Sequence, residues 1–232
     1  MLSLSPLEQE ALVLSFRVAV WASIVSLPPA IAVAWLLARK DFWGKLVVDG
    51  LVHLPLVIPP VVVGYCLLVI LGRNGVIGSW LYDTFGLTFA FNWKGAAVAA
   101  GVMGFPLFVR SVRLSIEAID TKLETAARTL GASAWKTFWT VSLPLMAPGI
   151  LAGLLLAFAR ALSEFGATIT FVANIPGQTR TLPIAIYSVL QAPGGDTAAL
   201  RMVVLSTALA IIALATSEFM ARRLRARLYG QS

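Results

Sequence analysis

The sequence predicts an all-α, polytopic helical membrane protein with about five transmembrane helices. Of its 232 residues, 59% are hydrophobic and only 12% are charged, whereas about a quarter of the residues in a soluble domain carry a charge. The apolar residues also fall in blocks of roughly 20 residues or more, the length of helix that crosses the hydrocarbon core of a bilayer. One soluble core could not bury all of these blocks, so we expect a single transmembrane domain over residues 1–232.

The five expected spans follow from these apolar blocks in chain order. The first contains Pro28-Pro29, and the second is broken by Pro55 and by Pro59-Pro60. The apolar segment Thr181–Gln191 is too short to cross the bilayer, so we expect it to lie at the outer surface or to re-enter the membrane from that side. The expected spans are residues 12–38, 47–71, 92–113, 147–171 and 198–221, with a loop at residues 114–146.

The distribution of basic residues predicts the orientation. Loops on the cytoplasmic side of a membrane are enriched in Lys and Arg, and most of the 18 basic residues follow the first, third and fifth spans. We therefore expect the N-terminus outside, and the C-terminus and the 114–146 loop in the cytoplasm. The same bias explains the net charge of +7 without a nucleic-acid partner, because no basic stripe with interleaved aromatic residues lies outside the spans.

Few residues in the sequence could carry chemistry. Cys66 is the only cysteine and His53 the only histidine, so we expect neither a disulfide nor a metal site within one chain. His53 is better explained as a packed polar residue than as a ligand. The phosphate-binding pattern GxxxxGK[ST] is absent from the sequence. We expect no catalytic residue, metal or cofactor in this chain.

The 114–146 loop has the pattern of two short helices joined by a turn. Leu123–Leu130 is rich in helix-forming residues, Gly131 can adopt the positive φ that ends a helix, and Ser133 could cap the next one. Trp135, Phe138 and Trp139 then recur at helical spacing. A compact tip of this kind suits a groove on a cytoplasmic partner. A pair of amphipathic helices lying in the headgroup region explains the same pattern equally well.

The same segment resembles the conserved loop of ABC-importer permeases, which is E-A-A, three residues, G, nine residues, and I-x-L-P. Here Thr125-Ala126-Ala127 is followed by three residues and Gly131, and nine more lead to Val141-Ser142-Leu143-Pro144. Thr125 stands where the first Glu of the pattern belongs, with Glu124 one place earlier, and Val141 replaces Ile.

This resemblance implies a coupling helix that sits in a cleft of a separate ATP-hydrolysing subunit, which would hold the ATP and Mg. Two copies of that subunit imply a homodimer of the permease. The residues implied in coupling are Glu124, Ala126, Ala127, Arg128, Gly131, Ala132, Leu143 and Pro144.

Outside the loop, the chain resembles the permeases of molybdate importers of the bacterial inner membrane. The matching stretches are HLPLVIPPVVVGYCLLVILGRNGVIG (residues 53–78), LSEFGATITFVANIPGQTRTLPIAIY (162–187) and APGG (192–195). The resemblance implies import of molybdate, with tungstate at the same site, from an extracytoplasmic binding protein that meets Arg180 and residues 192–195. The alternatives are a permease for sulfate, thiosulfate or another oxyanion, which shares part of these patterns, and an ion-gradient-driven secondary transporter. The second alternative predicts an inverted repeat, and the sequence shows none.

A path for a tetrahedral dianion requires hydroxyls, free backbone N–H groups and a modest positive potential. Breaks in membrane helices expose such backbone groups and are tolerated only against protein or a wet cavity. Arg160 and Glu164 lie four residues apart, on one helix face deep in the fourth span. They predict either a gate or dimer seam, or a structural ion pair. The candidate pathway residues are Pro55, Pro59, Pro60, Arg160, Ser163, Glu164, Gly166, Thr168 and Thr170.

Overall fold

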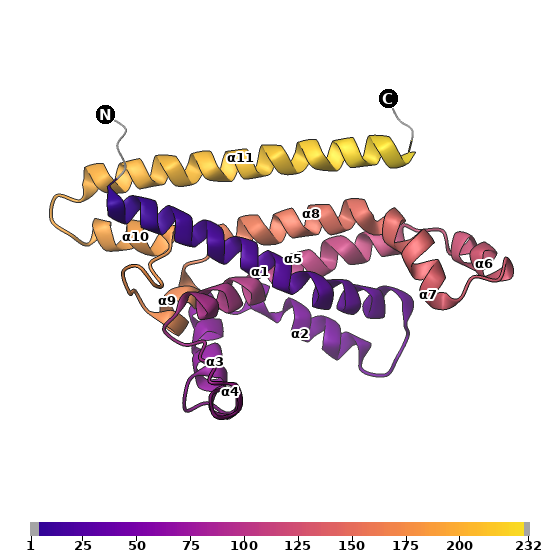
Figure 1. Ribbon diagram of the computed structural model, residues 1–232, viewed down its shortest axis with the longest axis horizontal. Helices are drawn as coiled ribbons and strands as arrows, with labels where there is room; N and C mark the ends of the chain where they lie inside the picture. The colour runs from indigo at the N-terminus through magenta and orange to yellow at the C-terminus, as the bar shows by residue number, and fades with distance from the viewer. Residues whose placement is uncertain (1–4, 230–232) are drawn as a thin grey trace.

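The computed structural model describes residues 5–229, and over this range every regular element is a helix (Figure 1). The all-α fold class is therefore confirmed. The elements are α1 (Pro6–Arg39), α2 (Lys45–Val57), α3 (Pro60–Leu71), α4 (Val76–Phe85), α5 (Trp93–Glu117), α6 (Thr121–Thr129), α7 (Ala134–Thr137), the π-helix η1 (Phe138–Ser142), α8 (Leu143–Leu162), α9 (Gly166–Val172), α10 (Leu182–Leu190) and α11 (Asp196–Tyr229).

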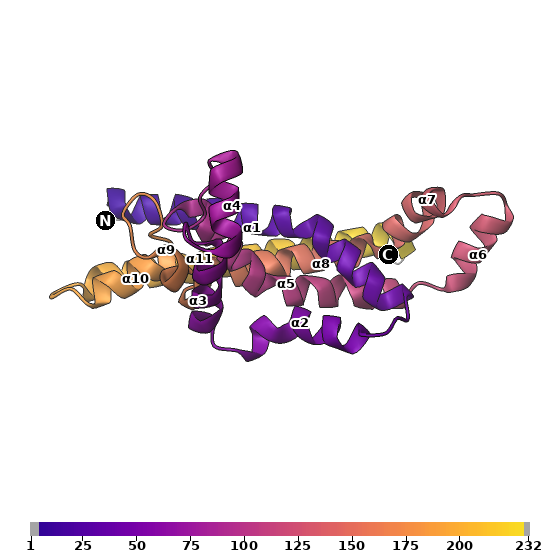
Figure 2. The same cartoon turned by 90° about the horizontal axis from the view of Figure 1, so that it is seen from below.

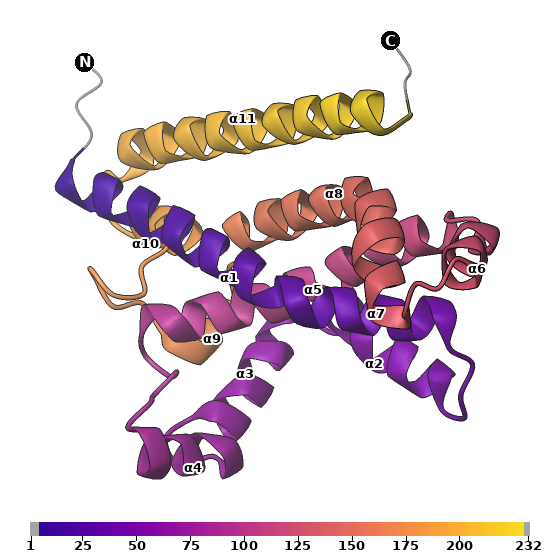
Figure 3. The same cartoon turned by 45° about the vertical axis from the view of Figure 1, so that its right-hand side comes forward.

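Four long helices, α1, α5, α8 and α11, run along the length of the molecule (Figures 1 and 2). The short helices α6 and α7 project at one end, called the α6 end below, and α10 lies at the opposite end, called the α10 end. The helix α3 turns away from this bundle and carries α4 at its tip (Figure 3). The middle of the segment at residues 114–146, which carries α6 and α7, thus projects beyond the long helices, while its two ends belong to α5 and α8.

Four helical stretches of the described residues are long and apolar enough to cross a membrane, and the bent pair α2 and α3 makes a fifth when counted as one span. This agrees with the five expected spans, although several boundaries differ. The four stretches are Pro6–Arg39, Trp93–Glu117, Ala134–Leu162 and Asp196–Thr216.

The helix α5 lies at the centre of the packing, in contact with α1 and α8 along most of its length. Its first half presents small buried residues, among them Ala96, Ala99 and Ala100, which let neighbouring helices approach closely. At Gly104 the approach is close enough that an added methyl group would lie 3.1 Å from the carbonyl oxygen of Ala157 in α8. Larger residues such as Phe108 and Ile116 fill the core of the second half.

The second expected span is not straight, because α2 and α3 meet at an angle of 116°. The break was expected at both Pro55 and Pro59-Pro60, but Pro55 lies inside α2, and only the Pro59-Pro60 break is present. Pro59 has extended backbone with ψ 136°, and Pro60 begins α3, as its fixed φ and missing N–H favour. Pro55 removes one helical hydrogen bond without ending the helix.

The fourth expected span, residues 147–171, does not coincide with one helix. The helical stretch begins at Ala134 and ends at Leu162. Ser163 and Glu164 then form a short break, Phe165 has φ −127° and ψ −57°, and the chain resumes as α9 at Gly166. The buried polar contacts of Glu164, described below, stabilise this break.

The segment Thr181–Gln191 forms α10, whose nine residues span about 14 Å, too little to cross a bilayer. It packs against α1 and α11 at the α10 end. Leu182 and Ile184 are buried there, and the backbone N–H of Leu182 donates to the hydroxyl of Ser15 at 2.6 Å. The last helix, α11, begins at Asp196 and extends beyond the expected end of the fifth span at residue 221.

Candidate functional sites at the 114–146 loop and the fourth span

The turn between the two short helices of the 114–146 loop depends on Gly131. Gly131 has φ +88°, a conformation that residues with a Cβ rarely adopt. Its N–H donates to the carbonyl of Arg128, and the N–H of Ala132 donates to the carbonyl of Ala127, both at 3.0 Å. This pair of bonds is the Schellman motif that ends a helix, so the turn predicted at Gly131 is confirmed.

The tip of this turn is exposed. Leu130 is 89% exposed, and Ala126, Arg128 and Gly131 are also on the surface, while Ala127 and Ala132 are half-buried. No atom lies within 4 Å of the position that a Cβ at Gly131 would occupy. The tip is thus a small, mainly uncharged surface standing clear of the rest of the chain.

The side chain of Glu124 points away from this exposed tip, toward Ser142 and the end of α1. One oxygen of its carboxylate, Oε1, accepts from Ser142 Oγ at 2.8 Å and from Arg39 Nη2 at 3.2 Å. Thr125, the next residue, is exposed, and its hydroxyl donates to the carbonyl of Thr121 in its own helix. The carboxylate that stands one place early in the sequence pattern therefore faces the interior of the protein.

The second half of the loop carries the aromatic residues. Ser133 caps α7, where its hydroxyl accepts from the N–H of Lys136, as expected. Phe138 packs edge-on against Trp35 of α1 with 5.3 Å between ring centroids, whereas Trp135 and Trp139 are 71% and 50% exposed. Leu143 and Pro144 are the first two residues of α8.

Arg160 and Glu164 form an ion pair at the end of α8, with 2.6 Å between Arg160 Nη1 and Glu164 Oε2. The Glu164 side chain is only 1% exposed, and that of Arg160 is 25% exposed. The other oxygen of Glu164, Oε1, accepts from the backbone N–H of Ala167 at 2.8 Å. This carboxylate therefore both pairs with Arg160 and caps the first turn of α9.

The two breaks in the spans lie against each other. A methyl group added at Gly166 would lie 2.8 Å from Pro60 Cβ, and one added at Gly64 would lie 2.5 Å from the carbonyl oxygen of Ala167. Only glycine at these two positions allows α3 and α9 to cross so closely. The structure thus brings Pro60 of the second span against Gly166 of the fourth.

The remaining candidate pathway residues have other positions. The hydroxyls of Ser163 and Thr170 donate to backbone carbonyls of their own segment, those of Arg160 and Gly166. Thr168 is 1% exposed and faces the core. Pro55 lines an apolar cavity of about 890 Å³ between α1, α2 and α5. The hydroxyls of Ser163 and Thr170 thus make hydrogen bonds to nearby backbone carbonyls, as Ser and Thr in helices often do.

The chain after α9 forms a compact polar loop at the α10 end. Ala173 has φ +60° and ψ −166°, a strained conformation for any residue other than glycine. The buried hydroxyl of Thr179 holds this loop by donating to the carbonyl of Ala173 and accepting from the N–H of Ile175. Arg180 donates to Asn174 Oδ1 at 2.7 Å. Thr179 was not anticipated because nothing in the sequence marks a loop hydroxyl as buried.

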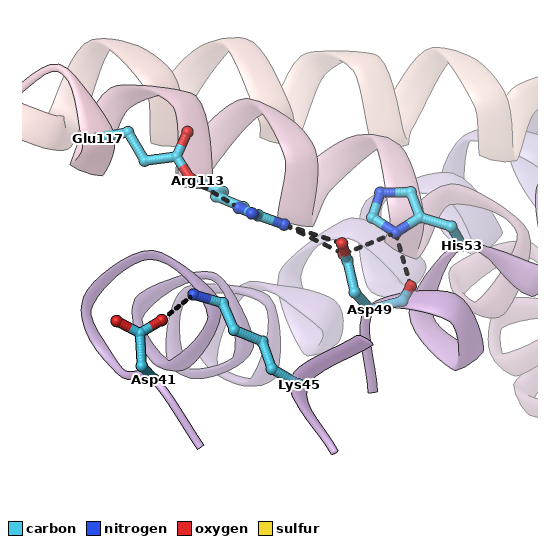
Figure 4. Close-up of polar contacts among 6 residues, drawn as sticks. All are labelled: Asp41, Lys45, Asp49, His53, Arg113 and Glu117. Atoms are coloured by element: carbon cyan, nitrogen blue, oxygen red, sulfur yellow. Dashed lines mark hydrogen bonds and ion pairs between the residues drawn. The ribbon is translucent and has the colours of Figure 1, made fainter. Parts of the chain in front are cut away.

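A polar cluster near the α6 end joins α2 to α5 (Figure 4). Arg113 contacts both carboxylate oxygens of Asp49, at 3.2 and 3.1 Å, and donates to Glu117 at 2.8 Å. His53 Nδ1 lies 2.9 Å from the Asp49 carbonyl oxygen and 3.2 Å from its carboxylate. Lys45 and Asp41 form a separate, exposed pair. Sequence reasoning missed the cluster because Asp49 and Arg113 are 64 residues apart.

Comparison with known proteins identifies the family. Residues 30–226 match the model of the binding-protein-dependent transport system inner membrane component. The chain is 58% identical over 220 residues to the molybdenum transport system permease protein ModB of Escherichia coli (strain K12), covering 95% of this chain and 96% of that protein. It is 56% identical over 222 residues to the protein of the same name from Haemophilus influenzae, covering 96% and 97% of the two chains.

A solved structure supports the fold. The crystal structure of a bacterial ABC transporter involved in the import of the acidic polysaccharide alginate contains a chain that aligns with a TM-score of 0.73 at 18% identity. The alignment covers 95% of this chain and 80% of that one. The chain belongs to the family of binding-protein-dependent transport system inner membrane components.

Proposed function

We propose that this chain is the membrane-spanning permease subunit of an ATP-driven importer that carries molybdate, with tungstate at the same site, into the bacterial cytoplasm. The near-full-length identity of 58% to a molybdenum transport permease supports the substrate. The exposed helix–turn–helix at Gly131 is the observation that carries the coupling mechanism. The chain itself breaks no bond, because the energy comes from ATP hydrolysed on a partner subunit.

The partner ATPase docks on the tip of the 114–146 loop in this proposal. The small exposed residues around Gly131 favour insertion into a cleft, since little side-chain entropy is lost there. Arg128 adds one positive charge to the tip, and Leu130 adds an exposed apolar side chain. Three further residues contribute to coupling without touching the partner. Glu124 acts from inside the loop, and Leu143 and Pro144 act from the start of α8.

A second copy of this chain completes the transport path. The helix α3 leaves the bundle (Figure 3) and exposes apolar side chains, including Val61, Tyr65 and Val69, which fits burial against another protein surface. The breaks at Pro59-Pro60 and at Ser163–Phe165 then lie near the dimer axis. Closure of two ATPase subunits tilts the helices that carry these breaks, and so alternates access between the two sides of the membrane.

We propose that the α10 end faces outward, where a molybdate-binding protein delivers the anion, and that the α6 end faces the cytoplasm. The bias of Lys and Arg toward the loops at the α6 end supports this. Arg180 and residues 192–195 lie at the α10 end and are available to that binding protein. The protein is a multi-pass component of the bacterial inner membrane.

The proposed function is tested by uptake of radiolabelled molybdate into cells that lack the gene for this chain. Uptake should fall to background, return when the chain is supplied, and require a functional partner ATPase. Excess tungstate should compete with molybdate, and excess sulfate should not. Competition by sulfate as strong as by tungstate would instead favour the sulfate permease, and uptake that persists without ATP would favour a secondary transporter.

The orientation is tested with single-cysteine variants. Cys66 is the only cysteine in the chain, so a Cys66→Ser background carrying Lys136→Cys has one thiol on the 114–146 loop. We expect a membrane-impermeant maleimide to label it only after the inner membrane is permeabilised. The matched variant Gln178→Cys at the α10 end should react in intact spheroplasts. Labelling of Lys136→Cys in intact spheroplasts would show that the 114–146 loop faces outward, where it could not contact a cytoplasmic ATPase.

A further inference from the structure

Three elements meet where the 114–146 loop joins the bundle: the end of α1, the helix α6, and the π-helix η1 that leads into α8. Glu124 of α6 holds them together, because its Oε1 accepts both from Ser142 Oγ at 2.8 Å and from Arg39 Nη2 at 3.2 Å. Arg39 is the last residue of α1, and Ser142 is the last residue of η1. One carboxylate oxygen thus connects the loop to two different long helices.

Aromatic contacts join the same three elements. The Arg39 guanidinium lies 5.8 Å from the ring centroid of Trp35, and Trp35 packs edge-on against Phe138, the first residue of η1. Arg39 Nη2 also lies 3.5 Å from the carbonyl oxygen of Ile119, just before α6. The junction therefore has a polar centre at Glu124 and an aromatic wall beside it.

This junction is shielded from water. The side chains of Glu124 and Arg39 are 13% and 16% exposed, and Ser142 is 1% exposed. The Asp41–Lys45 pair, also near the α6 end, contrasts with it, because Asp41 is 99% exposed there. Surface pairs contribute little, whereas removing one partner of a shielded pair leaves an uncompensated charge. Removal of one partner of the Glu124 contacts is therefore expected to cost more than removal of one partner of a surface pair.

The contact with Ser142 lies at a π-helical turn. In η1 the N–H of Leu143 donates to the carbonyl of Phe138, five residues back, and single turns of this kind are rare and often lie at functional sites. The turn lies between the exposed tip and the long helix α8. A push on the tip would be lost if the chain bent at this turn. Ser142, the last residue of this turn, is bound to Glu124 at 2.8 Å.

We propose that Glu124 is a positioning residue that couples the tip of the loop rigidly to α1 and α8. Its carboxylate holds η1 in one geometry, so displacement of the loop moves α8 and its Arg160–Glu164 break instead of bending the joint. This role rests on the proposed function and deepens it. It also explains the shifted sequence pattern, because a carboxylate at position 124 faces the joint whereas position 125 faces outward.

The test uses the complete complex of permease, ATPase and binding protein in proteoliposomes, with molybdate uptake and ATP hydrolysis measured on the same sample. For Glu124→Ala we expect molybdate transported per ATP hydrolysed to fall by about tenfold, the size expected for loss of a hydrogen-bonded charge. ATP hydrolysis per assembled complex should stay near the wild-type rate. For Glu124→Gln, which keeps an acceptor oxygen, the molybdate transported per ATP hydrolysed should lie between the values for the wild type and for Glu124→Ala.

Ser142→Ala provides a variant that removes one hydrogen bond and no charge, and it covers the case in which Glu124→Ala fails to assemble. Its transport per ATP should also fall, while Asp41→Asn on the exposed pair should match the wild type. An unchanged ratio in both Ser142→Ala and Glu124→Gln overturns the proposal, even if the amount of complex drops. Failure of the proposed function itself would appear differently, as no ATP-dependent uptake by the wild-type complex.

Discussion

Replacing Gly131 by valine is expected to reduce ATP-driven molybdate uptake by about tenfold or more, while the protein still inserts into the membrane. Gly131 has φ +88°, and left-handed backbone costs an L-residue about 1–2 kcal/mol, with further crowding from a β-branched side chain. Because no atom lies within 4 Å of an added Cβ, the cost falls on the turn itself. The chain would leave this conformation, and the direction of α7 would change.

Two variants separate this explanation from others. Gly131→Asn adds a side chain of similar size that tolerates positive φ, so it should retain most of the uptake. Gly86→Val places the same residue at φ +65°, again with no atom within 4 Å, at the end of α4, and should not uncouple transport from ATP hydrolysis. Normal uptake by Gly131→Val would contradict the prediction. Equal loss in Gly131→Asn would show that bulk at the ATPase contact, not φ, is what matters.

The turn at Gly131 could be predicted from the sequence because its causes are local. A glycine after a run of helix formers, followed by a serine, is enough to specify a Schellman motif and an N-cap. Both lie where expected, with their hydrogen bonds made within a few residues. The composition and the lengths of the apolar blocks fixed the fold class in the same way, since hydropathy requires no knowledge of neighbours.

The geometry of the broken spans could not be predicted this way. Pro59-Pro60 marks a break, but the angle of 116° depends on how α3 packs against α9 at Gly64 and Gly166. Pro55 has the same chemistry as Pro59 and stays within α2, because membrane helices tolerate an isolated proline. Whether a proline breaks a span is therefore decided by tertiary contacts that lie outside its own segment.

The polar contacts also differ in whether the sequence could predict them. Arg160 and Glu164 are four residues apart in the sequence, and this spacing was sufficient to predict their pairing, although α8 ends at Leu162 and Glu164 lies in the break that follows. Arg39 and Glu124 are 85 residues apart, and Asp49 and Arg113 are 64 apart, so no pattern in the sequence connects them. The resemblance placed Glu124 among the residues implied in coupling, but only the structure shows which way its carboxylate points.

Replacing Glu164 by alanine should reduce the amount of assembled protein, or its transport, more than replacing Arg160 and Glu164 together. The single change leaves the Arg160 guanidinium without its partner at a largely buried site, and breaking a buried pair costs about 3–5 kcal/mol. Because the Arg160 side chain is 25% exposed, the loss should lie toward the lower end of that range. The double replacement removes both charges and avoids this cost.

Arg160→Ala is expected to be at least as damaging as Glu164→Ala. The carboxylate that it leaves behind is only 1% exposed, so water can do less to stabilise it than it does for the guanidinium. The amount of protein recovered from membranes in mild detergent, and its thermal unfolding midpoint, measure these effects. Lys45→Ala, which breaks the exposed pair with Asp41, should leave both quantities unchanged, since surface pairs contribute about 0–1 kcal/mol.

The double replacement should not restore full stability, because Glu164 has a second role. Its Oε1 caps α9 by accepting from the N–H of Ala167 at 2.8 Å, and loss of such a cap costs about 1 kcal/mol. The variant Arg160→Ala with Glu164→Gln removes both charges but keeps the acceptor, so it should come closest to the wild type. The expected order of stability is therefore wild type, the Ala/Gln double variant, the Ala/Ala double variant, and then the two single alanine variants. Strictly additive losses from the single variants would mean that Arg160 and Glu164 are not coupled, and that the break in the fourth span is held by other contacts.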